Sequence, residues 1–176
     1  MKQVILIGPP GSGKSAVGSE LASRLGFSFI DTDACIVKRE GRAISDIFVD
    51  AGEAHFRAVE CAIVQEVLKQ DCSVLSLGGG AILDEGTQSR LLEARASGAE
   101  ILFLTISLTT AVERIGLNKE RPMLLINPRQ QWSALLAARI GIYEKLATRT
   151  YSTDGETAEA VAEKIYVELA GAHARD

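Results

Sequence analysis

Residues 8–15 read Gly8-Pro9-Pro10-Gly11-Ser12-Gly13-Lys14-Ser15, which matches the pattern G-x-x-x-x-G-K-[ST] of a phosphate-binding loop. An apolar run, residues 4–7, precedes the loop, and Val17, Leu21 and Leu25 follow it at helical spacing. A strand, a glycine-rich turn and a helix in this order form the context in which such a loop binds phosphate. A chance glycine-rich turn, the alternative, would not account for both flanks. The sequence therefore predicts that this loop binds the phosphates of a nucleoside triphosphate.

Each fixed position of the loop has a chemical reason. Glycines such as Gly11 and Gly13 let the backbone wrap closely round the phosphates, so that N–H groups, including that of Ser12, point inward. Lys14 is predicted to reach the β- and γ-phosphates, and Ser15 to offer its hydroxyl group to Mg²⁺. The order of the glycines does not match the G-x-G-x-x-G pattern of dinucleotide-binding loops.

The composition fits one globular domain. The chain has 176 residues, of which 47% are hydrophobic and 24% charged, so residues 1–176 are predicted to form a single domain. The net charge of −4 argues against a broad nucleic-acid surface, which needs dense Lys and Arg. No apolar run approaches the roughly 20 residues that span a bilayer, so no membrane association is expected. Three cysteines without metal-ligand spacing are typical of thiols in a reducing cytoplasm, the expected location.

Short apolar runs alternate with longer amphipathic patterns along the chain. This alternation is typical of a parallel sheet that is covered by helices on both faces. The predicted fold is therefore α/β, a three-layer α/β/α arrangement around a central five-stranded parallel sheet. Apolar residues that recur every four positions predict helices around residues 17–25, 59–67 and 161–169. The predicted strands are residues 4–7, 27–30, 74–77, 101–106 and 148–152.

Two carboxylates follow the second predicted strand, in Ile30-Asp31-Thr32-Asp33. A phosphate-binding loop of this class usually works with an acid that helps to hold Mg²⁺, and the strand of residues 74–77 ends in glycines instead. Residues i and i+2 of an extended chain point the same way, toward the end of the sheet where ligands bind. Asp31 is therefore predicted to serve the metal and Asp33 a substrate hydroxyl group. Alternatively, Asp33 only caps the following helix, which leaves Asp31 unexplained.

Two further stretches interrupt the alternation. Gly78-Gly79-Gly80 is either a plain turn or a place where a substrate approaches bare backbone N–H groups. Three successive glycines cost more chain entropy than a turn requires, which favours the second interpretation. Residues 116–129 contain two prolines and the arginines Arg121 and Arg129. A loop of this length in a compact domain is usually functional; the alternative is a solvated surface loop.

These features, in this order, make the sequence similar to the shikimate kinases. The resemblance extends through nearly the whole chain. The phosphate loop alone is shared by many other proteins, whereas the Asp-x-Asp, Phe-Arg-x-x-Glu and triple-glycine motifs together are far more specific. The matching set comprises the phosphate loop, Asp31-Thr32-Asp33, Gly52-Glu53, Phe56-Arg57 with Glu60, Gly78-Gly79-Gly80, Arg121-Pro122, and Arg139 with Tyr143.

The resemblance implies transfer of the γ-phosphoryl group of ATP to the 3-hydroxyl group of shikimate, a step in aromatic amino acid biosynthesis. It also implies a substrate-binding region over about residues 32–60 and a mobile lid over about residues 114–127. Arg114 would lie near the adenine and Arg121 in the lid. The implied ATP site consists of Gly11, Ser12, Gly13, Lys14, Ser15, Ala16, Arg114 and Arg121.

The acceptor-side roles come from the same resemblance. Arg57 and Arg139 would bind the substrate carboxylate, and Gly79 and Gly80 would line that pocket. Asp33 would accept hydrogen bonds from substrate hydroxyl groups. Asp31 would assist Mg²⁺ through water, beside Ser15. The residues implied to be catalytic are Lys14, Asp33 and Arg121.

Elementary chemistry bears on the two arginines and on a nearby histidine. A planar guanidinium group suits a carboxylate, and Glu60, one helical turn after Arg57, could hold it in place. The alternative is a surface salt bridge worth only a few tenths of a kcal/mol. Gly141 should loosen the helix of Arg139 by about 1 kcal/mol relative to Ala and so affect the aim of that side chain. His55 has no motif partner and is expected to be a solvated helix residue.

Two other classes of function remain open at this point. One is a related kinase for gluconate or a nucleoside monophosphate; a nucleotide acceptor needs a base pocket, and only 5% of the chain is aromatic. The other is a non-catalytic nucleotide-binding protein, which should have lost an acceptor-side residue, whereas Asp33, Arg57 and Arg139 are all present. No obvious exposed apolar stripe is seen, which favours a monomer.

Overall fold

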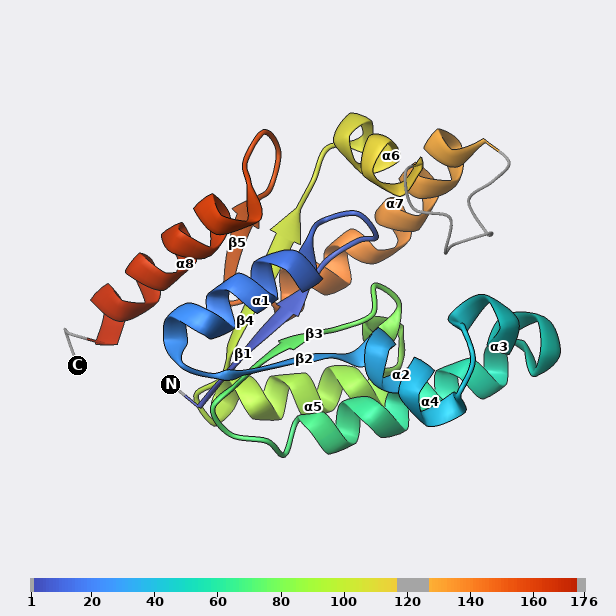
Figure 1. The fold of residues 1–176 in the computed structure, drawn as a ribbon, viewed down its shortest axis with the longest axis horizontal. Helices are drawn as coiled ribbons and strands as arrows, with labels where there is room; N and C mark the ends of the chain where they lie inside the picture. Colours follow the sequence, from blue (N-terminus) through green and yellow to red (C-terminus); the bar gives the residue numbers. More distant parts are fainter. Residues whose placement is uncertain (1, 117–126, 174–176) are drawn as a thin grey trace.

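The computed structural model describes residues 2–116 and 127–173. It contains a five-stranded sheet in the order β2-β3-β1-β4-β5, in which all neighbouring strands run parallel (Figure 1). Each observed strand end lies within one residue of its prediction. The strands are β1 (Gln3–Ile7), β2 (Ser28–Asp31), β3 (Ser73–Ser76), β4 (Glu100–Thr105) and β5 (Arg149–Ser152).

Helices connect the strands, and the three predicted from periodicity lie within α1, α4 and α8. Residues 116, 128 and 129, expected in a loop, are helical instead. Residue 116 is the last of α6, and α7 begins with Pro128 in its first turn, where proline is well tolerated. No helix among the described residues is long and apolar enough to cross a bilayer. The helices are α1 (Lys14–Leu25), α2 (Thr32–Glu40), α3 (Ile44–Asp50), α4 (Gly52–Val67), α5 (Glu85–Ala96), α6 (Leu108–Gly116), α7 (Pro128–Leu146) and α8 (Ala158–His173), with a short 3₁₀ helix at Ala81–Leu83.

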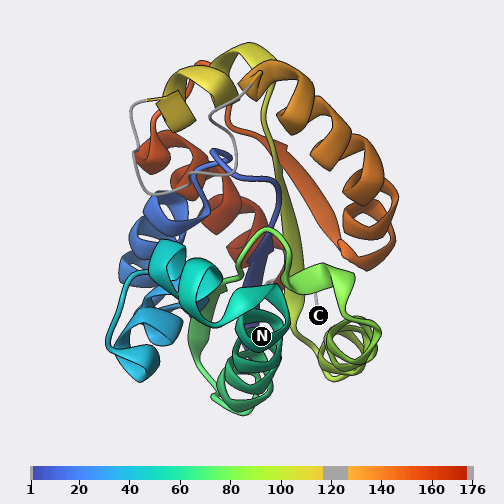
Figure 2. The ribbon, with the colours of Figure 1, turned by 90° about the vertical axis from the view of Figure 1, so that its right-hand side faces the viewer.

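The central strand β1 separates two apolar cores. Ile5 and Ile7 face a core that includes residues of α4, α5 and α7, while Val4 and Leu6 face α1 and α8. Figures 1 and 2 show the helices divided between the two sides of the sheet. Because both faces are covered, β1 is buried along its whole length, and residues 4–7 form a continuous apolar run. The predicted three-layer α/β/α fold is confirmed.

The strand order places the predicted site at the carboxyl ends of the strands. β1 lies between β3 and β4, so the chain connections diverge to both sides of it. A crevice forms at the carboxyl ends of parallel strands where their connections diverge in this way. The phosphate loop follows β1, Asp31 ends β2, and the triple glycine follows β3. All three segments therefore meet at the carboxyl end of the sheet.

Gly141 lies inside α7, which continues unbroken to Leu146. A Cβ atom at this position would have no atom within 4 Å beyond its own helix and chain neighbours. Gly141→Ala is therefore expected to stabilise the protein by about 0.5–1 kcal/mol, measured as a higher urea midpoint, because alanine loses less chain entropy in a helix.

Gly18 in α1 supplies the matched control. A Cβ atom there would lie 2.6 Å from the ring of Phe29, so Gly18→Ala should lower the urea midpoint by overpacking. A lower midpoint for Gly141→Ala as well would contradict the expectation.

Candidate active site

The phosphate loop leads from β1 directly into α1. The N-cap of α1, Gly13, has a φ of 81°, a left-handed conformation that favours glycine. No side chain caps this described helix end, so its N–H groups and positive dipole can serve an anion. Lys14 Nζ folds over the loop and donates to the backbone oxygens of Gly8 (2.9 Å) and Pro9 (3.0 Å). The loop therefore presents an ammonium group and backbone donors suited to a chain of phosphates.

Ser15 and Asp31 supply oxygen atoms beside the loop. Ser15 Oγ donates a 2.5 Å hydrogen bond to Asp31 Oδ2 and lies 3.4 Å from Ser76 Oγ. Mg²⁺ prefers such hard oxygen ligands and usually takes only one or two from the protein, with phosphates and water completing its shell. Among the described residues, no three His, Cys, Asp or Glu side chains gather as a metal site. The donor set therefore fits a Mg²⁺ ion that arrives with a nucleotide.

The helix cap after β2 is Asp31. Its Oδ1 accepts hydrogen bonds from the backbone N–H groups of Asp33 (2.9 Å) and Ala34 (3.2 Å). The alternative in which Asp33 caps the helix is therefore wrong. The premise that both aspartates lie in one extended strand is also wrong, because the chain turns into α2 at Thr32. Asp31 and Asp33 can still divide the predicted roles, since each faces a different neighbour.

Gly78 leaves room for two carboxylates. A Cβ atom at this position would lie 2.7 Å from Asp33 Oδ1 and 2.6 Å from Glu60 Oε1, distances that sterics forbid. The N–H group of Gly78 already donates to Thr32 Oγ1 at 2.9 Å. The interpretation of the triple glycine as a set of bare N–H donors is therefore wrong for Gly78, where the acidic neighbours require a glycine.

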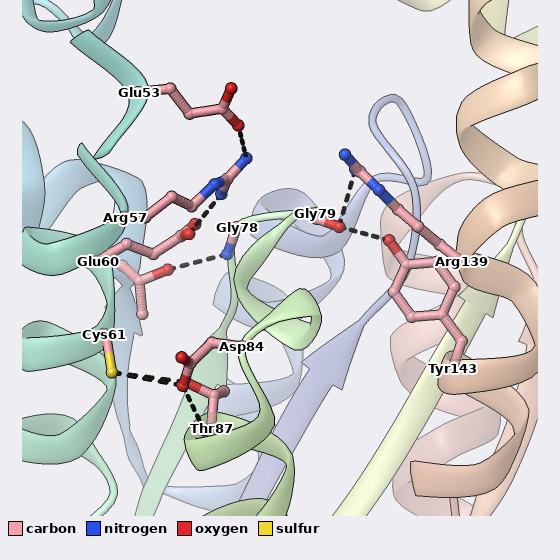
Figure 3. Close-up of polar contacts among 11 residues, drawn as sticks. Glu53, Arg57, Glu60, Cys61, Gly78, Gly79, Asp84, Thr87, Arg139 and Tyr143 are labelled. Atoms are coloured by element: carbon pink, nitrogen blue, oxygen red, sulfur yellow. Dashed lines mark hydrogen bonds and ion pairs between the residues drawn. The ribbon is translucent and has the colours of Figure 1, made fainter. Parts of the chain in front are cut away.

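Arg57 is held from several sides at the start of α4 (Figure 3). Its Nη1 donates to Glu60 Oε2, its Nη2 lies 3.4 Å from Glu53 Oε1, and its guanidinium carbon lies 5.1 Å from the centroid of the Phe56 ring. The side chain of Glu60 is only 4% exposed, so the alternative of a surface salt bridge is wrong. A Cβ atom on Gly80 would lie 2.6 Å from Arg57 Nη1. The guanidinium group thus packs against bare backbone.

Arg139 approaches the glycines from the opposite side, on α7 (Figure 3). Its Nη1 donates to the Gly79 carbonyl oxygen at 3.1 Å, and Tyr143 donates to the same oxygen at 2.6 Å. The continuous helix keeps both side chains on the face that points at this loop, despite Gly141. Arg57 and Arg139 therefore flank Gly79 and Gly80, the arrangement expected for a carboxylate pocket.

Arg114, on α6, lies beside the phosphate loop. Its guanidinium group donates to the Gly11 carbonyl (3.2 Å) and to the Thr153 hydroxyl (3.2 Å) and carbonyl (2.9 Å). A hollow of about 180 Å³ lies beside it, lined also by Gly13 and Ala16. The structure thus places Arg114 and Ala16 together at the start of α1. Arg121 and most of the predicted lid lie outside the described residues.

The structure also shows contacts that sequence reasoning missed. The Trp132 indole N–H donates to the Pro10 carbonyl at 3.0 Å, and Tyr143 bonds Gly79 as described above. His55 is exposed, as expected, but its Nε2 lies 3.0 Å from Glu40 Oε2. The motif containing Tyr143 was the only available signal for any of these contacts, because hydrogen bonds between distant segments leave no periodic pattern.

Comparison with known proteins adds an independent line of support. A family model described as shikimate kinase matches residues 10–170. A shikimate kinase of Streptomyces coelicolor is 48% identical over 158 residues, which cover 90% of this chain and 90% of the relative. A shikimate kinase of Thermobifida fusca is 47% identical over 168 residues, covering 96% and 95%.

The fold comparison gives the same family. The structure of the shikimate kinase from Acinetobacter baumannii in complex with shikimate superposes with a TM-score of 0.91 at 31% identity, covering 97% of this chain and 94% of that one. Because a family model and relatives above 30% identity each span most of its length, the chain belongs to the shikimate kinase family.

Proposed function

We infer that the chain transfers the γ-phosphoryl group of ATP to the 3-hydroxyl group of shikimate. Kinase activity follows from its family. The observation that carries the acceptor assignment is the convergence of Arg57 and Arg139 on residues 78–80, the glycine loop. This loop packs against the phosphate loop, since a Cβ atom on Gly79 would lie 3.3 Å from the Gly8 oxygen. Two guanidinium groups beside bare backbone suit a small carboxylate, and shikimate is a carboxylated polyol.

Binding precedes chemistry in this proposal. Arg57, pre-oriented by Glu60, and Arg139 bind the carboxylate, while Gly79 and Gly80 let the ring approach the backbone. Asp33 accepts a hydrogen bond from the hydroxyl group that will react. Because Asp33 and Glu60 both lie against Gly78, the carboxylate-binding and hydroxyl-binding ends of the pocket are fixed relative to each other.

The transfer step forms one bond and breaks another. The 3-hydroxyl oxygen bonds to the γ-phosphorus while the bond from that phosphorus to the oxygen bridging it to ADP breaks, and the hydroxyl proton passes to Asp33 or to solvent. Phosphoryl transfer depends mainly on positioning and charge stabilisation. The main role of Asp33 is therefore to orient the hydroxyl group, and accepting its proton is a secondary role. Lys14 stabilises the charge on the transferring group and on the departing ADP.

The remaining assignments complete the proposal. Ser15 would hold Mg²⁺ directly and Asp31 through water; when bound, the ion neutralises charge on the β- and γ-phosphate oxygens. Gly11, Ser12 and Gly13 bind phosphates through the backbone, and Arg114 and Ala16 lie beside the adenine. Arg121, in a lid over about residues 114–127, closes over the phosphates. We further propose a cytoplasmic monomer that binds neither nucleic acid nor membrane; the net charge of −4 disfavours binding to a nucleic-acid backbone.

The test is a coupled assay of ADP release with MgATP and shikimate. Gluconate, AMP and CMP serve as competing acceptors, since related kinase folds use such substrates. The proposal expects turnover that depends on shikimate and exceeds that with each other acceptor by orders of magnitude. ADP release that does not respond to shikimate, or that is faster with another acceptor, would contradict it.

The buried carboxyl group of Glu60 is expected to set an acid limit on shikimate use. Burial raises the pKa of Glu60 above the usual 4.5, although the guanidinium group of Arg57 acts in the opposite direction. As the pH falls through this raised pKa, Glu60 loses its charge and Arg57 its anchor, so kcat/KM for shikimate should fall. The free energy of unfolding depends on pH in the opposite direction. The stability that Glu60 contributes is fully present below pH 4.5 and is lost as the pH rises through the pKa of Glu60 in the folded protein.

The pH profile of kcat/KM for shikimate, measured from pH 4.5 upward, tests this expectation. Glu60→Gln should flatten the acid limb, because no carboxyl group remains to titrate at that position. Glu53→Gln, which alters an exposed partner of the same arginine, should keep the limb. An unchanged limb in Glu60→Gln would assign it to another group.

A further inference from the structure

Helix α7 carries two aromatic side chains whose polar atoms bond the two loops of the active site. Trp132 and Tyr143 are both buried, with exposed fractions of 2% and 0%. The indole N–H of Trp132 donates to the Pro10 carbonyl of the phosphate loop at 3.0 Å. The hydroxyl group of Tyr143 donates to the Gly79 carbonyl of the glycine loop at 2.6 Å. One rigid element thus bonds the donor side and the acceptor side.

Tyr143 is fixed by the sheet as well as by its hydrogen bond. Its ring stacks on Phe103, with centroids 5.0 Å apart and an interplanar angle of 21°. Phe103 lies on β4 beside Ile7, the last residue of β1 before the phosphate loop. The hydroxyl group therefore reaches Gly79 from a position that the core defines. Arg139 shares this carbonyl, so Tyr143 can keep the glycine loop in place when Arg139 turns to a substrate.

Trp132 is fixed in the same way at the other end of the helix. Its ring packs in a separate apolar cluster with Ile106 and Ala111, which belong to the segment after β4 and to α6. Its only polar side-chain atom is the indole nitrogen, and that atom bonds the phosphate loop. Tyr143 lies eleven positions after Trp132, which is roughly 16 Å along a helix at about 1.5 Å per residue.

The two loops also touch each other directly. A Cβ atom added to Gly79 would lie 3.3 Å from the Gly8 oxygen and 3.3 Å from Pro10 Cδ. Contacts therefore form a closed circuit from α7 through Trp132 and Pro10 to Gly79 and back through Tyr143. Within this buried circuit, the two hydrogen bonds from α7 hold the two loops against each other.

We propose that α7 sets the distance between the phosphate loop and the glycine loop, and that Trp132 and Tyr143 are positioning residues for phosphoryl transfer. The inference rests on the proposed function, since only a reaction between ligands of the two loops needs this distance. Neither side chain touches the reacting atoms. Both act on the ternary complex, in which a displacement of about 1 Å can slow transfer up to about 10²-fold.

The experiment compares Tyr143→Phe and Trp132→Phe with the wild-type chain. Each variant keeps an aromatic ring in the core and loses the donor to its loop. We expect kcat to fall about 10-fold in each, while the dissociation constants for ADP and for shikimate, measured separately by calorimetry, stay within about twofold. Unfolding of part of the protein would also lower the apparent kcat without changing the dissociation constants, so thermal unfolding and the calorimetric binding stoichiometry are measured alongside.

Tyr151→Phe is the matched control. Its hydroxyl group donates to Glu168 at 2.7 Å, away from both loops, and its loss should leave kcat near the wild-type value. A kcat within twofold of wild type in either folded variant would overturn the inference, and so would a loss explained by weaker binding of one ligand. If only one variant folds, that variant decides. Wild-type protein without shikimate-dependent turnover would instead overturn the proposed function.

Discussion

Replacing Lys14 with alanine is expected to lower kcat for ATP-dependent phosphorylation of shikimate by roughly 10²- to 10³-fold, the effect of removing one donor that stabilises charge in a transition state. The ammonium group lies within hydrogen-bonding distance of the Gly8 and Pro9 carbonyls. It is therefore already at the phosphate loop before a nucleotide binds. Because the charge it stabilises grows during transfer, kcat should fall more than the affinity for ATP.

Steady-state kinetics with saturating shikimate would measure this effect. The matched control is Lys69→Ala, which removes an exposed lysine just after α4, at the amino end of the sheet and away from the site. The kcat of this variant should match that of wild type. Thermal unfolding checks that the lost hydrogen bonds to Gly8 and Pro9 have not unfolded Lys14→Ala. A folded variant with near-normal kcat would remove Lys14 from its assigned role.

The α/β fold could be predicted because parallel strands that are covered on both faces carry short runs of apolar residues. Residues 4–7 show this most clearly, since β1 has a helical layer on each face. The phosphate loop fixed the order of the first strand, turn and helix. The ends of all five strands were predicted to within one residue. The acceptor-side residues came from the ordered family motifs, because spacing alone would have favoured a surface salt bridge between Arg57 and Glu60.

Local ambiguity limited the prediction near Asp31. Both aspartates are good helix caps, and which one caps depends on where β2 ends. That end is decided by pairing with β3, where Asp31 lies opposite Ser76. The burial of Glu60 depends similarly on tertiary structure. An i,i+3 pair has the same spacing on a surface and in a core, and here the glycine loop covers it.

The contacts of α7 could not be predicted at all from local sequence. The hydrogen bonds of Tyr143 and Trp132 join residues 64 and 122 positions apart. A buried aromatic residue on a helix is usually explained by packing, and both residues do pack in apolar clusters. Only the three-dimensional arrangement shows that each polar atom meets a different loop of the site.

Replacing Arg57 with alanine is expected to reduce kcat/KM for shikimate by about 2–5 kcal/mol, which corresponds to roughly 30- to 4,000-fold. The change removes a guanidinium group that Glu60, Glu53 and the Phe56 ring hold in place. It leaves the substrate carboxylate without one of its two partners, and it leaves Glu60, which is almost fully buried, without its counter-ion. The loss should appear mainly in KM for shikimate, while KM for ATP stays close to wild type.

Two further arginine variants separate charge, shape and location in this result. Arg57→Lys keeps the charge but not the planar fork, so its kcat/KM for shikimate should fall between those of wild type and Arg57→Ala. Arg42→Ala removes an arginine of the same region that pairs with Glu40 and Asp50, and it should leave KM for shikimate unchanged. If Arg57→Ala kept wild-type kcat and KM for shikimate, Arg57 would not belong to the site. The convergence of two guanidinium groups on the glycine loop would then no longer support a carboxylate acceptor.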